Sequence, residues 1–105
     1  MYAPLPYCVY ILFCEKDNLL YTGYTSDLQR RLQQHRNGQS NNTSKRLPVK
    51  LVFCEYYLFK EDAIKREGYF KTTAGKKAIK LMLSSSLEKL NYAAIKTGKL
   101  EIINE

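Results

Sequence analysis

The stretch YCVYILFCEKDNLLYTGYT, residues 7–25, decides the fold of this chain. Its first part, residues 7–13, is a run of β-branched and aromatic residues, and its last part, residues 19–25, has the same character. Between them, EKDN at residues 15–18 is a polar cluster typical of a tight turn. The stretch therefore predicts a β-hairpin.

Strand alternation assigns two tyrosines of this hairpin to one face. In the first strand Cys8, Tyr10 and Leu12 share a face, and in the second strand Tyr21 and Gly23 share one. With the turn centred in the polar cluster, Tyr10 and Tyr21 come out on the same side, diagonal to each other. Gly23 would let another group approach the backbone closely. Two tyrosines that simply pack in or beside the core would show the same pattern.

A helix and an exposed loop are expected after the hairpin. Ser26 and Asp27 are both good N-caps for the amphipathic segment 28–36, and the pair Asn37-Gly38 ends that helix. Residues 39–47 are polar and rich in turn formers, which predicts an exposed loop.

The rest of the chain predicts one more strand and three helices: a strand at residues 50–58, helices at residues 60–71 and 75–83, and a tail helix at residues 87–96. Up to residue 83 the order is β-β-α-β-α-α. This order predicts an α+β fold in which helices flank a small three-stranded, mostly antiparallel sheet. We expect one domain over residues 1–83 and a C-terminal helical extension over residues 84–105.

Composition narrows the class of protein. A chain of 105 residues with 45% hydrophobic content supports one domain with a single core. Its apolar runs are too short for a membrane helix, and its N-terminus does not resemble a secretion signal. Three cysteines without a C-x-x-C pair, and one histidine, are too few ligands for a structural zinc site. We expect a soluble, cytoplasmic protein with reduced thiols.

Positive charge is concentrated in the middle of the chain. Lys and Arg number 17 against 10 Asp and Glu, a net charge of +7, and residues 30–80 hold 13 basic and 4 acidic residues, a net of +9. A local excess of this size favours a polyanionic partner, with nucleic acid as the first candidate. Lysines that only keep a protein in solution would give the same total.

Polar residues lie beside the apolar stripe of the first helix. Leu28 and Leu32 form the stripe, while Arg31 and His35 are a second i, i+4 pair next to it. Both polar side chains therefore point along one line at the edge of the packed face. An ion pair between Asp27 and Arg31, with His35 exposed, is the alternative.

Glu67 breaks the pattern of the helix that follows the third strand. It lies among Ala63, Ile64 and Phe70, which we expect to form the buried side. A carboxylate in that position needs a cation, a metal ion or a cluster of donors, because burying it unpaired costs several kcal/mol. A partly exposed Glu67 paired with Lys71 at i+4 is the alternative.

The set of motifs resembles the GIY-YIG nuclease superfamily, in particular its small single-domain members related to the N-terminal domain of the UvrC excision-repair nuclease. The residues that carry the resemblance are Cys8-Val9-Tyr10 for the first motif, Tyr21-Thr22-Gly23 for the second, Arg31 and His35 on the next helix, and Arg66-Glu67 with Tyr69, Phe70 and Lys71 further on. Cys8 replaces the nominal glycine of the family and Thr22 the nominal isoleucine. The resemblance covers about residues 7–83.

The resemblance implies an α+β fold of the GIY-YIG type and a divalent-metal-dependent DNA endonuclease that hydrolyses phosphodiester bonds in DNA repair, recombination or processing. It implies that Glu67 ligates one Mg²⁺ (or Mn²⁺) ion and that Tyr21 is the general base for the attacking water. Arg31 would contact the scissile phosphate, Tyr10 would position it, and His35 would position a group or relay a proton.

Basic residues around these positions are the expected contacts to the DNA backbone: Arg30, Lys45, Arg46 and Lys71. No pattern indicates a residue that reads base edges, so we expect backbone- or structure-directed binding that weakens with salt. The main alternative is a catalytically inactive DNA-binding module in which Glu67 only forms a salt bridge. A third is a structural adaptor whose tail, residues 87–103, docks a partner.

Overall fold

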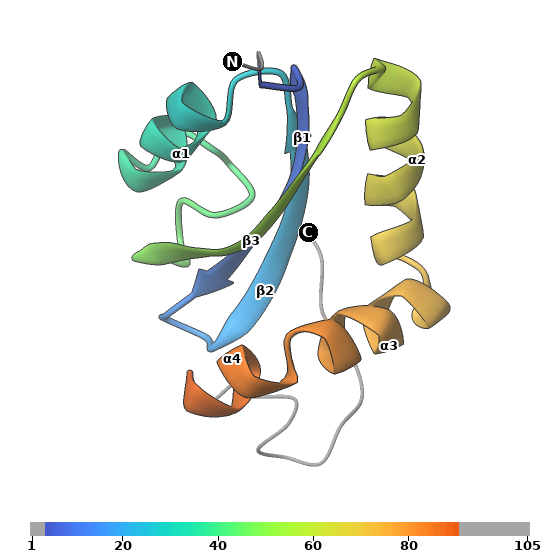
Figure 1. The fold of residues 1–105 in the computed structure, drawn as a ribbon. Coiled ribbons are helices and arrows are strands. Elements are labelled where there is room, and N and C mark those ends of the chain that lie inside the picture. Colours follow the sequence, from blue (N-terminus) through green and yellow to red (C-terminus); the bar gives the residue numbers. More distant parts are fainter. Residues whose placement is uncertain (1–3, 91–105) are drawn as a thin grey trace.

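The computed structural model describes residues 4–90 of the chain. Its elements in chain order are β1 (Tyr7–Cys14), β2 (Leu19–Thr25), α1 (Leu28–Arg36), β3 (Val49–Tyr57), α2 (Lys60–Phe70), α3 (Thr73–Met82) and α4 (Ser84–Lys89). The three strands form one antiparallel sheet in the order β2-β1-β3, and helices flank it (Figure 1). The predicted α+β fold is confirmed.

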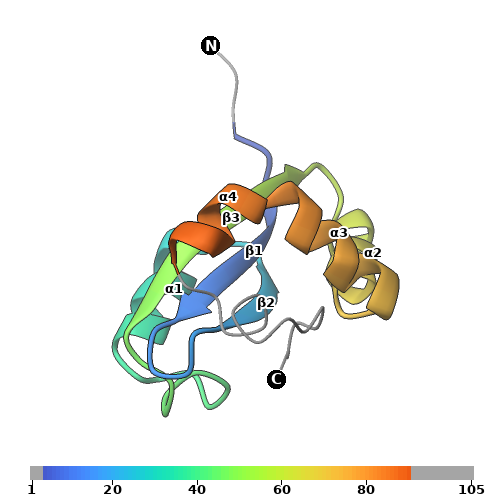
Figure 2. The same ribbon diagram turned by 90° about the horizontal axis from the view of Figure 1, so that it is seen from below.

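The sheet separates α1 on one face from α2 and α3 on the other, as both ribbon views show (Figures 1 and 2). Because side chains alternate along the central strand β1, that strand contributes to two cores. Val9, Ile11 and Phe13 pack toward α2 and α3, whereas Tyr10 and Leu12 pack toward α1. Tyr10 is thereby held in the layer between the sheet and α1.

Several element boundaries differ from the sequence prediction. Helix α3 begins at Thr73, two residues earlier than expected, because the Thr72 hydroxyl accepts a hydrogen bond from the Gly75 backbone N–H at 3.0 Å and caps the helix. Helix α4 runs from Ser84 to Lys89, so it begins three residues before the predicted tail helix of residues 87–96, and Leu87 is buried in the core shared by β1 and α2. The rest of the predicted tail helix lies outside the described residues.

Gly75 allows α3 to pack against the end of α2. A Cβ atom at this position would lie 1.9 Å from the Tyr69 carbonyl oxygen and 2.7 Å from the Phe70 Cα, and both are backbone atoms that cannot rotate away. Gly75→Ala is therefore expected to lower the free energy of unfolding by roughly 2–4 kcal/mol, measured by urea denaturation.

Gly68 provides a matched control for this substitution. It lies in α2, where a Cβ atom would meet nothing within 4 Å. Because alanine has the higher helix propensity, Gly68→Ala is expected to raise the free energy of unfolding by about 0.5–1 kcal/mol. Equal destabilisation by the two substitutions would contradict the close contact at Gly75.

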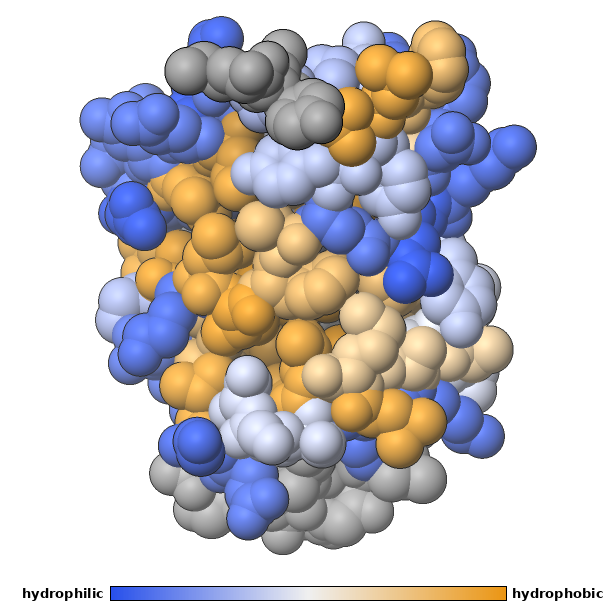
Figure 3. All heavy atoms as spheres, viewed as in Figure 1, coloured by the Kyte–Doolittle hydropathy of each residue, from blue (hydrophilic) through white to orange (hydrophobic). Residues whose placement is uncertain are grey.

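Strand β3 forms an edge of the sheet and carries an apolar surface. Its side chains are mostly half-buried, and Tyr56, Leu58 and Phe59 at its end are exposed. Figure 3 shows apolar side chains gathered over this side of the molecule. The predicted site residues belong to other elements. Within residues 4–90, we find no helix with the length and hydrophobicity needed to cross a membrane.

Candidate active site

Two phenols of the hairpin lie against each other on the α1 face. Tyr10 pairs with Gly23 across the strands, and Leu12 pairs with Tyr21, so the two tyrosines are diagonal neighbours with ring centroids 6.4 Å apart. Tyr10 is 1% exposed and Tyr21 is 5% exposed. A Cβ atom at position 23 would lie 2.5 Å from the Tyr10 hydroxyl oxygen. Glycine is thus required for the Tyr10 ring to lie over β2.

Helix α1 brings Arg31 to these phenols. Its N-terminus is fixed by Asp27, whose carboxylate accepts a hydrogen bond from the Arg30 backbone N–H at 3.1 Å. The guanidinium of Arg31 donates from Nε to the Tyr10 hydroxyl at 3.3 Å, from Nη1 to Gln34 at 3.0 Å and from Nη2 to Ser40 at 3.3 Å. Arg31 therefore spans from the hairpin to the loop after α1.

The charge of Arg31 is shaped by both phenols. The largest single influence on the pKa of the Arg31 guanidinium is desolvation, which lowers it. The hydrogen bond to Tyr10 and the proximity of Tyr10 and Tyr21 raise it, and together they outweigh desolvation, so the pKa lies above its ordinary value. Burial raises the pKa of Tyr10 to about 12, against the lowering effect of the hydrogen bond from Arg31. At neutral pH the site thus holds a cation beside a protonated Tyr10.

His35 is fully buried rather than exposed beside the stripe. Its Nε2 lies 2.9 Å from the Tyr10 hydroxyl, and its Nδ1 lies 2.7 Å from the Thr43 hydroxyl. Burial, together with the charge of Arg31, lowers the pKa of His35 to about 4. A neutral imidazole has one donor and one acceptor nitrogen, so it links the two hydroxyls in a single hydrogen-bonded row.

The low pKa of His35 predicts a pH dependence of stability. The unfolded chain binds a proton at this side chain near pH 6.5, whereas the folded chain binds it only near pH 4. The free energy of unfolding is therefore expected to fall by roughly 2–4 kcal/mol as the pH drops from above 6.5 to about 4. Denaturation curves of the wild type and His35→Gln across this range isolate the contribution, because the variant should lack it.

The chain's single histidine also allows a direct check of this prediction. The imidazole resonances in a proton NMR titration of the wild type should remain those of a neutral ring down to about pH 5. Titration near pH 6.5 in the folded protein would contradict the buried, neutral His35.

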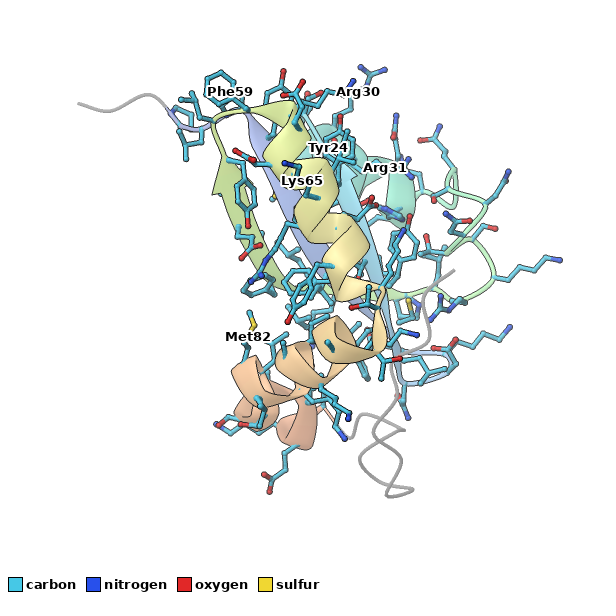
Figure 4. The ribbon with its side chains drawn as sticks, turned by 90° about the vertical axis from the view of Figure 1, so that its right-hand side faces the viewer. Tyr24, Arg30, Arg31, Phe59, Lys65 and Met82 are labelled. Carbon is cyan, nitrogen blue, oxygen red and sulfur yellow. The ribbon has the colours of Figure 1, made fainter. Side chains whose placement is uncertain are left out.

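Glu67 comes from α2, on the other side of the sheet. Its side chain is 23% exposed, and its Oε2 lies 3.4 Å from the Lys71 ammonium nitrogen, one helical turn away. Burial is the main cause of the raised pKa of Tyr10, and the negative charge of Glu67 makes the smallest contribution to it. Figure 4, which looks at α2 from outside, shows Lys65 on this helix and Arg31 on α1 behind it.

The buried side of α2 is narrower than the sequence indicated. Ala63 and Phe70 are fully buried, but Ile64 is 45% exposed, so the prediction of a buried Ile64 is wrong. Residues seven positions apart lie on one line of a helix, and Ala63 and Phe70 define that line. Glu67 lies between them in the sequence, beside the buried line, and remains partly accessible to solvent.

The predicted DNA contacts occupy different environments. Arg30 and Lys45 are exposed, and Lys71 is paired with Glu67. Arg46 is 11% exposed, and its Nε lies 2.7 Å from the Asp17 carboxylate. Its Nη2 also donates to the Leu20 carbonyl at 3.5 Å, so Arg46 ties the loop after α1 to the hairpin.

Sequence reasoning missed three polar residues of the loop after α1. Ser40 contacts Arg31, Asn42 donates to the Tyr21 hydroxyl at 3.2 Å, and Thr43 contacts His35. Ser40 and Thr43 are buried, so the prediction of a uniformly exposed loop is wrong at these positions. No sequence signal separated these residues from other turn formers.

The donor set fits a metal site built on one carboxylate. Within residues 4–90, no group of three or more His, Cys, Asp or Glu side chains is placed to hold an ion. Mg²⁺ commonly takes one or two carboxylates and completes its shell with water and phosphate oxygens. The partly exposed Glu67 carboxylate meets that requirement. Residues 4–90 do not provide a cluster of side chains that would surround an ion completely.

Comparison with known proteins identifies the family. The profile described as the GIY-YIG catalytic domain matches residues 6–80, which is more than half of the chain. The chain belongs to the GIY-YIG family. The family is one of nucleases, so nucleic acid is the substrate that its fold implies. Both phenols, Arg31, His35 and Glu67 fall within the matched GIY-YIG domain, and α4 follows it.

Relatives of this GIY-YIG protein carry the family name UPF0213. The UPF0213 protein CPE1444 of Clostridium perfringens is 42% identical over 85 residues, covering 80% of this chain and 90% of the relative. The UPF0213 protein SSP2268 of Staphylococcus saprophyticus is 44% identical over 75 residues, covering 70% and 90%. No solved structure matches this chain.

Proposed function

We propose that this GIY-YIG protein is a divalent-metal-dependent DNA endonuclease that acts in DNA repair, recombination or processing. The observation that carries the proposal is the convergence of Tyr10, Tyr21 and Arg31, which come from two elements and interact over the α1 face of the sheet. His35 supports this group from within the core. Glu67 adds a carboxylate on α2, on the other face of the sheet, whose charge acts on Tyr10.

Tyr21 is the proposed general base for the attacking water. Tyr10, with its pKa raised to about 12 and its hydroxyl engaged by Arg31 and His35, is a poor proton acceptor near neutral pH. Tyr21 is therefore the phenol proposed to act, in its ionised form, as acceptor of the proton of the attacking water. Tyr10 is instead proposed to position the phosphate, with its orientation set by His35.

Arg31 is the proposed electrostatic partner of the scissile phosphate. Its pKa is raised, so it stays charged throughout the accessible pH range. A guanidinium that is already held by Tyr10, Gln34 and Ser40 needs little reorganisation when negative charge develops on the phosphate. As general base, Tyr21 acts as a phenolate and becomes the neutral phenol when it takes up the proton of the attacking water; Arg31 lies close enough to Tyr21 to interact with that negative charge before the transfer.

Glu67 is the proposed metal ligand, with one Mg²⁺ or Mn²⁺ ion. When bound, such an ion supplies Lewis-acid stabilisation of the phosphate oxygens. Lys71 holds one Glu67 oxygen at 3.4 Å, a long ion-pair distance at a partly exposed position. Pairs of this kind contribute little to stability, so Lys71 can release the carboxylate at low cost. Lys71 is then free to contact the DNA backbone.

The exposed Arg30 and Lys45 are the proposed further contacts to DNA phosphates. Arg46 is a weaker candidate, because its side chain is already paired with Asp17. Binding through phosphates should weaken steeply with salt and depend little on base sequence. The described cysteines are free, which is compatible with the reducing cytoplasm, where we place the protein.

The experiment that tests the proposal is nicking of supercoiled plasmid and of branched DNA, with and without Mg²⁺ or Mn²⁺. Metal-dependent nicking by the wild type, lost on chelation with EDTA, supports the endonuclease. DNA binding by gel shift without any cleavage would instead favour the inactive DNA-binding module. In that case the Glu67–Lys71 pair would have only a structural role.

A further inference from the structure

The loop after α1, residues 39–46, makes hydrogen bonds to three members of the proposed site. Ser40 accepts from Arg31, Asn42 donates to Tyr21, and Thr43 contacts His35. Each loop residue thus reaches a different functional side chain. The loop is therefore part of the site's construction rather than a plain connection between α1 and β3.

The loop holds a defined shape. The Thr43 and Ser44 backbone N–H groups both donate to the Ser40 carbonyl, at 3.2 and 2.8 Å, and the Arg46 N–H donates to the Thr43 carbonyl at 2.9 Å. Beyond this turn the Arg46 side chain is anchored to Asp17 at 2.7 Å. A turn fixed in this way can hold a side chain in place against the hairpin.

Asn42 differs from the other two residues because it is exposed while its amide points to the site. Its Nδ2 donates to the Tyr21 hydroxyl oxygen at 3.2 Å, which occupies one lone pair of that oxygen. The phenol hydrogen is then directed elsewhere. When the phenol gives up its proton, the same amide N–H stabilises the negative charge on the oxygen.

We propose that Asn42 is a positioning residue for Tyr21, which it orients for proton transfer by a hydrogen bond from its side-chain amide. The inference rests on the proposed function, in which Tyr21 is the general base. Asn42 does not touch the phosphate in this proposal and acts only through the phenol. Its loss should therefore lower kcat and leave KM nearly unchanged.

The test compares substitutions at Asn42 with the same substitutions at Asn41, its exposed neighbour. Among the described residues, the Asn41 side chain makes no hydrogen bond to the site. Asn42→Ala should lower kcat for metal-dependent nicking about 10- to 100-fold, the range expected for losing a hydrogen bond to a group that acts in its charged form. Asn42→Asp, which has nearly the same shape but cannot donate, should be at least as impaired.

Asn41→Asp adds the same negative charge to the same turn and should stay within about threefold of the wild type, and Asn42→Gln should recover part of the lost kcat. A direct readout is the ζ-carbon resonance of ¹³C-labelled tyrosine, which should move for Tyr21 in Asn42→Ala and not in Asn41→Ala. Both variants should unfold at the wild-type temperature, since both positions are exposed.

The outcomes separate this inference from the proposed function. If the wild type cuts and Tyr21→Phe does not, while Asn42→Ala cuts like the wild type, the Asn42 inference is overturned and the nuclease stands. Equal losses in Asn41→Asp and Asn42→Asp, expressed in KM, would show a charge effect on DNA binding and overturn it as well. A wild type that does not cut any DNA overturns both.

Discussion

Replacing Tyr21 by phenylalanine is expected to lower the rate of metal-dependent DNA nicking about 100- to 10,000-fold, the range attributed to general acid–base catalysis. The substitution removes one hydroxyl from a ring that is already packed against Tyr10 and His35, at centroid distances of 6.4 and 5.4 Å. Packing should survive the change. Gel-shift affinity for DNA should therefore stay within a few-fold of the wild type while cleavage is lost.

Tyr24 gives the matched control for this substitution. It lies on the same strand but packs with the core beneath α2 and α3, on the opposite face of the sheet from Tyr21. Tyr24→Phe should cut DNA at nearly the wild-type rate. If Tyr21→Phe retained activity within threefold of Tyr24→Phe, Tyr21 would not be the base.

Replacing Glu67 by glutamine is expected to cause a comparable loss of cleavage. Glutamine keeps the shape of the side chain but removes the charge that binds a hard cation. Because a catalytic metal ion supplies several kcal/mol of transition-state stabilisation, nicking at saturating DNA should fall roughly 100- to 10,000-fold. Thermal unfolding should change little, since the only described ion pair that is lost is the one to Lys71, at a partly exposed position.

The control for Glu67 is Glu61→Gln, in the exposed first turn of the same helix. This variant should cut normally. Binding of Mn²⁺ in the presence of uncleavable DNA, followed by electron paramagnetic resonance, should weaken in Glu67→Gln and not in Glu61→Gln. Wild-type metal affinity in Glu67→Gln would remove this residue from the metal site, and full activity would remove it from catalysis.

The fold and the hairpin face could be predicted because local patterns determine them. Because side chains alternate between the two faces along β1 and β2, Tyr10 and Tyr21 lie on one face regardless of which helix packs there. The register of the two strands makes them diagonal neighbours, as expected. The start of α1 follows from two neighbouring cap candidates, Ser26 and Asp27, of which Asp27 caps the helix in the structure. These features depend on neighbours in sequence, so the sequence alone carries them.

The loop and the exposure of α2 could not be predicted, because tertiary contacts determine them. Ser40 and Thr43 are buried only because Arg31 and His35 offer them partners from a different element. Nothing in their own neighbourhood distinguishes them from the exposed Asn41. Ile64 is exposed because the three-stranded sheet covers only a narrow line of α2. The periodicity of apolar residues shows which side of a helix is buried, but it does not show how wide the surface is that packs against that side.

The order of the site's groups along the chain bears on how the protein is made. Both phenols, Arg31 and His35 precede β3, whereas Glu67 lies on α2, which follows it. A polypeptide still growing on the ribosome thus lacks the acidic group until most of the molecule has been translated. Under the proposed function, a copy truncated before α2 would lack the metal ligand and is expected not to cut DNA.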